Sequence, residues 1–236
     1  MTTVGAGAVL ASWERAQRTD GHDRAIALLD PTVDAASLPL GQRDALLLNL
    51  YREVRGPVVD ALATCPACEA MLEVHLLISD LVAQYPPGYG RSEFTAVDLG
   101  SVVVRARCPT TADLIGVAGA HTTAAARTAL LDRCVESVTR ADGRGDPLNE
   151  DEITCLGTYF EQVDPLVDAR IDIACAECGD AWSALLDVPA LVWAQVSGVG
   201  RRLLREVDAL ARRYSWSETE ILGMSDHRRH AYLDLT

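Results

Sequence analysis

Two short cysteine motifs carry the clearest chemistry in the sequence. The first knuckle is Cys65-x2-Cys68 and the second knuckle is Cys175-x2-Cys178. In a Cys-x2-Cys turn, two thiolates reach one tetrahedral ion at about 2.3 Å, and a structural zinc site takes four such ligands. Because the two knuckles together supply four thiolates, the sequence predicts one structural Zn2+ ion bound by Cys65, Cys68, Cys175 and Cys178.

Two other interpretations of the knuckles remain open. A redox-active dithiol of the thioredoxin type requires a knuckle between a strand and a long helix in a βαβ unit, and neither knuckle has that setting. The third interpretation is that the thiols bind no metal. The other three cysteines, Cys108, Cys134 and Cys155, are single and dispersed, so we expect them to be small buried hydrophobic residues.

The segments beside the knuckles resemble each other. Residues 70–76 follow the first knuckle and residues 181–186 follow the second, both with the alternating hydrophobicity of a half-buried strand, and each then meets a helix. This pattern indicates a degenerate internal repeat of two half-ribbons with 106 residues between the knuckles. A shared ion would fasten the N-terminal half of the chain to the C-terminal half and contribute to folding stability.

The other segments are mainly helical in pattern. Apolar spacing and capping signals predict helices at 8–17, 23–29, 42–54 and 122–133, one begun by Thr110 and one begun by Asn149 with Glu152. Further strands are expected at 94–99, 101–107 and 167–173, the first two as a hairpin after a Pro/Gly-rich loop at 85–90. We therefore predict an α+β, mostly α fold, with helices around a small zinc-ribbon-like β centre.

The end of the sequence predicts three helices in a row. Apolar residues recur every three or four positions from Pro189 to Tyr214, Ser217 with Glu220 caps a short helix, and Ser225 starts another. We divide the chain into a mixed α/β body at 1–188 and a C-terminal helical segment at 189–236 packed on it, although the two could form one domain.

This C-terminal segment is also the candidate partner surface. Seven of the 21 arginines fall between 201 and 229, and aromatic side chains lie among them. Arginine and aromatic residues are the preferred anchors of protein interfaces. The alternatives are packing alone or a reader of DNA resembling a helix-turn-helix, which the interspersed acidic residues disfavour. The candidate contact residues are Arg213, Tyr214, Trp216, Arg228, Arg229 and Tyr232.

Composition and missing motifs limit the function classes. The 236 residues carry a net charge of −13, which disfavours a protein that coats nucleic acid or anionic lipid. The sequence has no phosphate-binding loop, no His-Glu-x2-His and no Gly-x-Ser-x-Gly motif, and four thiolates leave a zinc ion no position for an activated water. We expect a cytoplasmic, membrane-free protein that is not an enzyme and has no small-molecule substrate.

Several stretches together resemble proteins encoded beside the tail and baseplate genes of phage-like contractile injection systems. They include LPLGQRDALLL at 38–48 and RCPTTADL at 107–114. The other stretches are the two knuckles, 130–135, 203–211, 214–222 and 228–233. Residues 107–188 are also similar to the T4-type phage baseplate protein family.

The resemblance implies a structural component or an assembly chaperone of the baseplate, the platform that joins spike, tube and sheath. Its partners would be protein subunits of the baseplate or the spike. The competing interpretation is a zinc-ribbon module associated with nucleic acid, in which the arginines of 201–229 meet phosphate.

Overall fold

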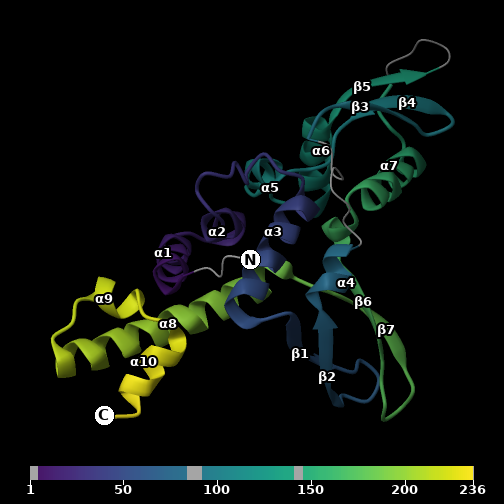
Figure 1. Cartoon of the computed structure of the whole chain (residues 1–236). Coiled ribbons are helices and arrows are strands. Elements are labelled where there is room, and N and C mark those ends of the chain that lie inside the picture. Colours follow the sequence, from purple (N-terminus) through teal and green to yellow (C-terminus); the bar gives the residue numbers. More distant parts are fainter. Residues whose placement is uncertain (1–4, 84–91, 141–145, 236) are drawn as a thin grey trace.

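The computed structural model describes residues 5–83, 92–140 and 146–235 and has the predicted mostly α, α+β fold (Figure 1). The helices are α1 (Ala6–Gln17), α2 (Gly21–Leu28), α3 (Leu40–Arg55), α4 (Ile78–Ala83), α5 (Thr111–Val117), α6 (Thr123–Cys134), α7 (Glu150–Val163), the 3-10 turn η1 (Pro165–Asp168), α8 (Val188–Tyr214), α9 (Glu218–Leu222) and α10 (Asp226–Leu233). The strands are β1 (Val58–Thr64), β2 (Met71–Leu77), β3 (Thr95–Asp98), β4 (Val102–Ala106), β5 (Val135–Arg140), β6 (Arg170–Ala174) and β7 (Ala181–Leu185).

Helices α1, α2, α3 and α8 form the main hydrophobic core. The apolar stripe that the sequence predicted on α8 is buried here, with Val192, Val196 and Leu203 in one cluster with Leu47 and Leu48 of α3. Burial of each such aliphatic side chain contributes about 1.5–3 kcal/mol. The first part of α8 is therefore fixed between α1 and α3. None of the helices in the described ranges combines the length and apolar composition needed to cross a membrane.

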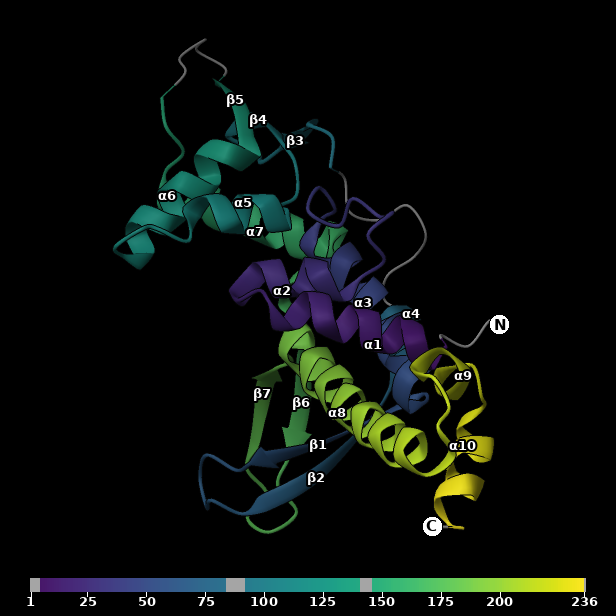
Figure 2. The same ribbon diagram turned by 90° about the vertical axis from the view of Figure 1, so that its left-hand side faces the viewer.

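Two antiparallel hairpins, β1-β2 and β6-β7, extend from this helical body at an angle to each other, and their turns converge (Figures 1 and 2). The turn of each hairpin is one knuckle. The bases of the hairpins are anchored in the main core, because Val59 on β1, Ile78 after β2 and Val188 after β7 are fully buried there. The core thus fixes where the two hairpins start, and their turns lie at the far end.

The strands that follow the knuckles, β2 and β7, confirm the prediction, but the sequence analysis missed β1. On β1 the bulky Leu62 is 68% exposed, whereas the small Ala61 and Ala63 lie on the more buried face. In a half-buried strand the large apolar side chains face the core, whereas on β1 the large side chain of Leu62 faces solvent. The predicted strand at 167–173 is wrong at its start, because Pro165–Asp168 form the 3-10 turn and β6 begins at Arg170.

A third sheet, β3-β4-β5, lies at the opposite end of the molecule with α6 and α7 (Figure 1). The predicted hairpin is confirmed as β3 and β4, with Gly100 at a φ of 84° in its turn. The sequence analysis missed β5, which begins at Val135 directly after the last residue of α6. No glycine or proline marks that change from helix to strand. The predicted loop at 85–90 lies outside the described residues.

Asp113 joins this third sheet to α5 and α6. Its buried carboxylate accepts hydrogen bonds from Arg107 at 2.6 and 2.9 Å and from Arg133 at 3.0 Å. It also completes the predicted cap of α5 with Thr110. Although burial acts to raise it, the hydrogen bonds from Arg107 and Thr110 hold the pKa of Asp113 well below its usual range. The RCPTTADL stretch thus forms a structural joint.

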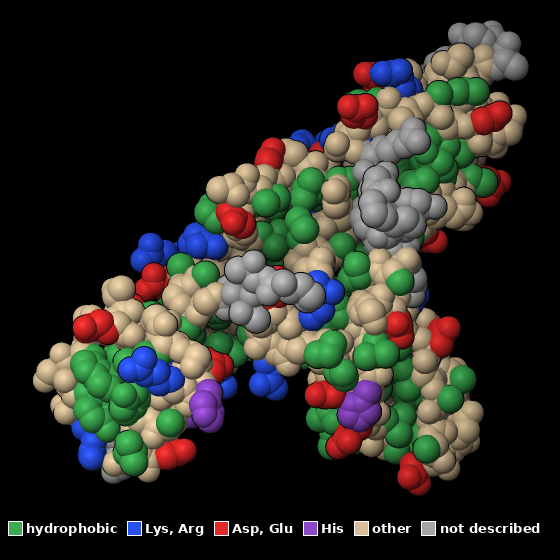
Figure 3. Space-filling view, viewed as in Figure 1, with side chains coloured by type: hydrophobic (Ala, Val, Ile, Leu, Met, Phe, Trp, Pro, Cys, Tyr) green, Lys and Arg blue, Asp and Glu red, His purple; other side chains and the backbone are tan. Residues whose placement is uncertain are grey.

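The chain closes with three helices, as predicted. Ser217 and Glu220 form the predicted capping box of α9, and Ser225 caps α10. Both short helices pack against the far part of α8 (Figure 1), where Leu210 and Ile221 are fully buried. In the space-filling view, a wide notch separates this C-terminal corner from the hairpins (Figure 3).

Alanine substitution at two glycines of α8 tests how closely α1 packs on this helix. A Cβ at Gly200 would lie 2.6 Å from Cγ of Trp13, so Gly200→Ala should lower the free energy of unfolding by about 1–3 kcal/mol. At the exposed Gly198 a Cβ would meet nothing within 4 Å, so Gly198→Ala should raise it by roughly 0.5–1 kcal/mol. Urea denaturation measures both, and effects of the same sign would contradict the packing.

Candidate metal centre

The structure brings the four predicted ligands together where the hairpin turns meet. The Sγ atoms of Cys65 and Cys178 lie 3.7 Å apart, as do those of Cys68 and Cys175, and all four sulfurs lie within 4.8 Å of one another. A disulfide needs about 2.05 Å between its sulfurs. Four sulfurs placed at about 2.3 Å from one central ion lie about 3.8 Å apart. The spacing therefore fits a tetrahedral metal site, and the cluster can hold a metal ion.

The two knuckles have the same backbone. In the first, the Cys65 N–H donates to Ala70 O at 2.9 Å, and in the second the Cys175 N–H donates to Asp180 O at 2.8 Å. The second knuckle places Gly179 at a φ of 77° after its last cysteine, and the first places Glu69 there at a φ of 60°. A non-glycine residue is uncommon at such an angle. The first knuckle therefore keeps the tight turn although it lacks the glycine.

The predicted internal repeat is confirmed and extends beyond the knuckles. Side-chain exposure follows the same order, position by position, along 61–78 and 171–188, which are 110 residues apart. Cys65 corresponds to Cys175, and Cys68 corresponds to Cys178. Exchange of the two repeats therefore converts the Cys65–Cys178 pair into the Cys175–Cys68 pair, and the Sγ–Sγ distance is 3.7 Å in both. The centre is thus approximately two-fold symmetric. In these segments the sequence is identical only at the two cysteine pairs and at Leu76, which corresponds to Leu186.

The electrostatics of the cluster favour a bound cation. Backbone N–H groups of Cys178 and Glu177 directed at Cys175 lower the pKa of that thiol to about 7. At Cys178 the N–H of Asp180 acts in the same direction, but the neighbouring thiol of Cys68 and burial outweigh it and raise the pKa to about 12. Four thiolates this close repel one another, and a divalent cation at their centre removes that repulsion.

The surroundings of the sulfurs indicate structural chemistry. Each knuckle has a buried first cysteine, Cys65 or Cys175, and an exposed second one, Cys68 or Cys178. Each lies between two strands rather than at the start of a helix, so the geometry is unlike that of a thioredoxin-type dithiol. Four sulfurs complete a tetrahedral shell, as in structural zinc sites. A metal ion bound by these four sulfurs would hold the two hairpins together.

The other three cysteines lie elsewhere in the fold. Cys108 and Cys134 are buried, as predicted. Cys155 is exposed on α7, so its prediction as a buried residue is wrong. A single cysteine on a helix gives no sequence signal for which face it occupies unless the helix packing is known.

The C-terminal corner gathers the predicted partner residues into one ring cluster. Tyr214 and Trp216 stack with ring centroids 4.5 Å apart, and Tyr232 meets the Trp216 ring edge-on at 4.8 Å. The exposed guanidinium of Arg213 lies over Tyr214, and that of Arg228 lies over Tyr232. All three rings are partly exposed. We call these five residues the arginine–aromatic corner.

Arg229 differs from the other candidates, and its predicted role as a partner contact needs correction. Its side chain is 1% exposed and bonds Glu206 at 2.9 Å, Met224 O at 2.6 Å and the carboxylate of Asp226. A charge buried this deeply is paired within the protein. Arg229 therefore fastens α10 to α8 and offers no donor to a partner.

Comparison with known proteins agrees with the resemblance. The family described as T4 bacteriophage base plate protein matches residues 23–188, most of the chain. The chain belongs to this family, whose members are structural proteins that associate in the baseplate. The matched region starts within α2, ends at the first residue of α8 and contains both knuckles. A search of curated proteins and a search of solved structures found no match.

Substitution of one cysteine tests whether the centre binds zinc. The untagged protein should contain about one Zn per chain, and Cys175→Ser should lose it and unfold at a lower temperature, because metal binding contributes to folding. Cys155→Ser is the matched control, since Cys155 is exposed and far from the cluster in the fold. Elemental analysis and thermal denaturation measure both properties. Equal zinc content in Cys175→Ser and the parent protein would contradict the site.

Proposed function

We propose that the protein is a non-enzymatic structural component or assembly chaperone of the baseplate of a phage-tail-like contractile injection system. One structural Zn2+ ion joins its two hairpins, and its partners are protein subunits of the baseplate or spike. It acts in the bacterial cytoplasm, where such a particle is assembled.

The observation that carries the proposal is the position of the four cysteines within the family region. The match to baseplate proteins spans both knuckles and the segment that connects them. A metal bound by Cys65 and Cys68 together with Cys175 and Cys178 closes a loop of about 110 residues. A centre of this kind stabilises a shape and leaves no ligand position for catalysis. Rigid shape is what a scaffold subunit requires.

The two sides of the notch differ in charge, and this difference favours a protein partner over nucleic acid. The two hairpins, residues 58–77 and 170–185, which we call the cysteine arm, contain six acidic residues and one arginine. Phosphate is repelled by such a surface. The arginine–aromatic corner, which lies outside the family match, instead presents rings and guanidinium groups of the kind that anchor protein interfaces.

Co-purification with baseplate and spike subunits of the same particle tests the corner. Trp216→Ala combined with Tyr232→Ala should reduce recovery of the partner about ten-fold or more, because truncation of a central aromatic anchor costs on the order of 2 kcal/mol. Arg212→Ala is the matched control: Arg212 is 80% exposed and pairs with Asp208 outside the corner.

Two outcomes would count against this function. Unchanged recovery with the double variant, while thermal denaturation shows that it is folded, would contradict the corner as the contact surface. Retention of the purified protein on DNA that falls steeply with salt, and that Arg213→Ala with Arg228→Ala weakens, would support the nucleic-acid module instead.

A further inference from the structure

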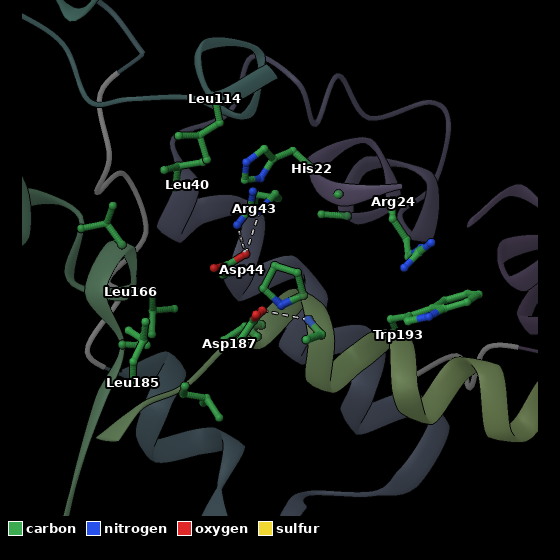
Figure 4. A pocket seen from close by; sticks show the side chains of 18 residues that line it. His22, Arg24, Leu40, Arg43, Asp44, Leu114, Leu166, Leu185, Asp187 and Trp193 are labelled. Carbon is green, nitrogen blue, oxygen red and sulfur yellow. Dashed lines mark hydrogen bonds and ion pairs between the residues drawn. The ribbon is translucent and has the colours of Figure 1, made fainter. Parts of the chain in front are cut away.

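A cavity of about 440 Å³ lies where α2, α3 and the start of α8 meet η1 and α5 (Figure 4). It is separate from the cysteine cluster and from the arginine–aromatic corner. Much of its wall is apolar, and the larger side chains in this part include Leu40, Leu114, Leu166, Leu186, Pro189 and Trp193. A cavity with an apolar wall and few polar groups is the usual form of a binding site.

One buried carboxylate faces this cavity. Asp44 is 6% exposed, and one of its oxygens accepts a hydrogen bond from Nε of Arg43 at 2.7 Å and forms an ion pair with Nη2 of Arg43, also at 2.7 Å. The other oxygen accepts no hydrogen bond from the described residues and points away from Arg43 (Figure 4). This oxygen is not fully enclosed by protein atoms, so a ligand in the cavity can reach it. Asp44 therefore has the capacity for one more donor from a ligand.

The charges around Asp44 favour a cationic donor. Burial raises the pKa of Asp44 to about 6, Arg43 opposes the rise, and the charges of Asp164 and Asp187 add to it. Among the residues that the structure describes, Arg43 is the one cation that pairs with Asp44, and it also donates to Thr111 Oγ1 at 3.1 Å. The ionised carboxylates thus outnumber the cation beside them, so a further positive charge would stabilise the ionised form of Asp44.

The basic groups at the mouth of the cavity do not fill this role. Arg24 donates to Thr19 O at 2.7 Å and to Asp20 at 2.8 Å, and its guanidinium stacks over the Trp193 ring at 4.8 Å. His22 lies on the exposed rim. The apolar wall and the Trp193 ring would contact the aliphatic part of a ligand whose charged end reaches Asp44.

We propose that this cavity binds a guanidinium or ammonium group on an aliphatic stem, and that its natural occupant is an arginine or lysine side chain of a protein partner. Asp44 accepts the charged group and the leucine and tryptophan side chains cover the stem. The identity of the partner as a baseplate subunit rests on the proposed function, whereas binding of the cation does not.

The probe for this site is agmatine, which carries a guanidinium on a four-carbon stem. We expect saturable binding to the full-length protein with a Kd on the order of 1 mM, seen as a shift of the Trp193 indole N–H signal in NMR spectra. Asp44→Asn should weaken binding at least ten-fold. Asp44→Asn removes one partner of a buried ion pair and can therefore destabilise the fold. Ala190→Trp serves as a second variant, because it narrows the mouth of the cavity from an exposed position and should also abolish binding.

The pH dependence of agmatine binding distinguishes the contribution of Asp44 from those of the other charged groups around the cavity. Binding should be about ten-fold weaker at pH 5 than at pH 7, because most Asp44 is protonated at the lower pH. Protonation of His22 at the rim would act in the same direction, so His22→Gln must keep the ten-fold change. Arg24 and Arg43 stay charged across this range, and Asp187 caps α8 through the Ala190 N–H at 3.0 Å.

The matched control is Asp172→Asn on the exposed face of β6, which should leave agmatine binding unchanged. Three results would overturn the proposal. They are no saturable binding of agmatine, binding of agmatine by Asp44→Asn and by Ala190→Trp that is as tight as in the parent protein, and binding of succinate in place of agmatine. Loss of the pH dependence in His22→Gln would also overturn it. If agmatine binds as expected but no baseplate subunit co-purifies, the site stands and the proposed function fails.

Discussion

The closeness of four cysteine sulfurs, all within 4.8 Å of one another, is the constraint around which the two hairpins are arranged. Two of the sulfurs come from the first half of the chain and two from the second, so a metal ion bound by all four would join the halves. The buried bases of the hairpins, at Val59 and Val188, hold the other end of the same arm in the helical core. A bound ion would thus fix the arm at its second end.

Much of this centre is predictable from the sequence because its signal is local. A Cys-x2-Cys turn is recognisable from four consecutive residues, and two of them in one chain predict a shared metal site. The strand β1 was missed because Leu62 faces solvent while Ala61 and Ala63 face inward. The length of the repeat was hidden in a similar way, since exposure rather than residue type is preserved between 61–78 and 171–188.

Other features depend on contacts between distant segments and have no local signal. Arg229 and Arg228 are adjacent in the sequence, yet one is buried against Glu206 and the other is exposed over Tyr232. Asp44 lies in the LPLGQRDALLL stretch, but its environment comes from elements as distant as Thr111 and Asp187. Sequence patterns identified the segments, and only the fold shows which of their charges are buried.

X-ray absorption spectroscopy at the zinc edge of the purified full-length protein tests the central claim most directly. The account predicts four sulfur atoms at about 2.3 Å from the metal and no nitrogen or oxygen neighbour in the first shell. Such a result would mean that both knuckles bind one ion. Two sulfurs with two lighter ligands would show that a single knuckle holds the zinc, and would contradict a centre that joins the two halves of the chain.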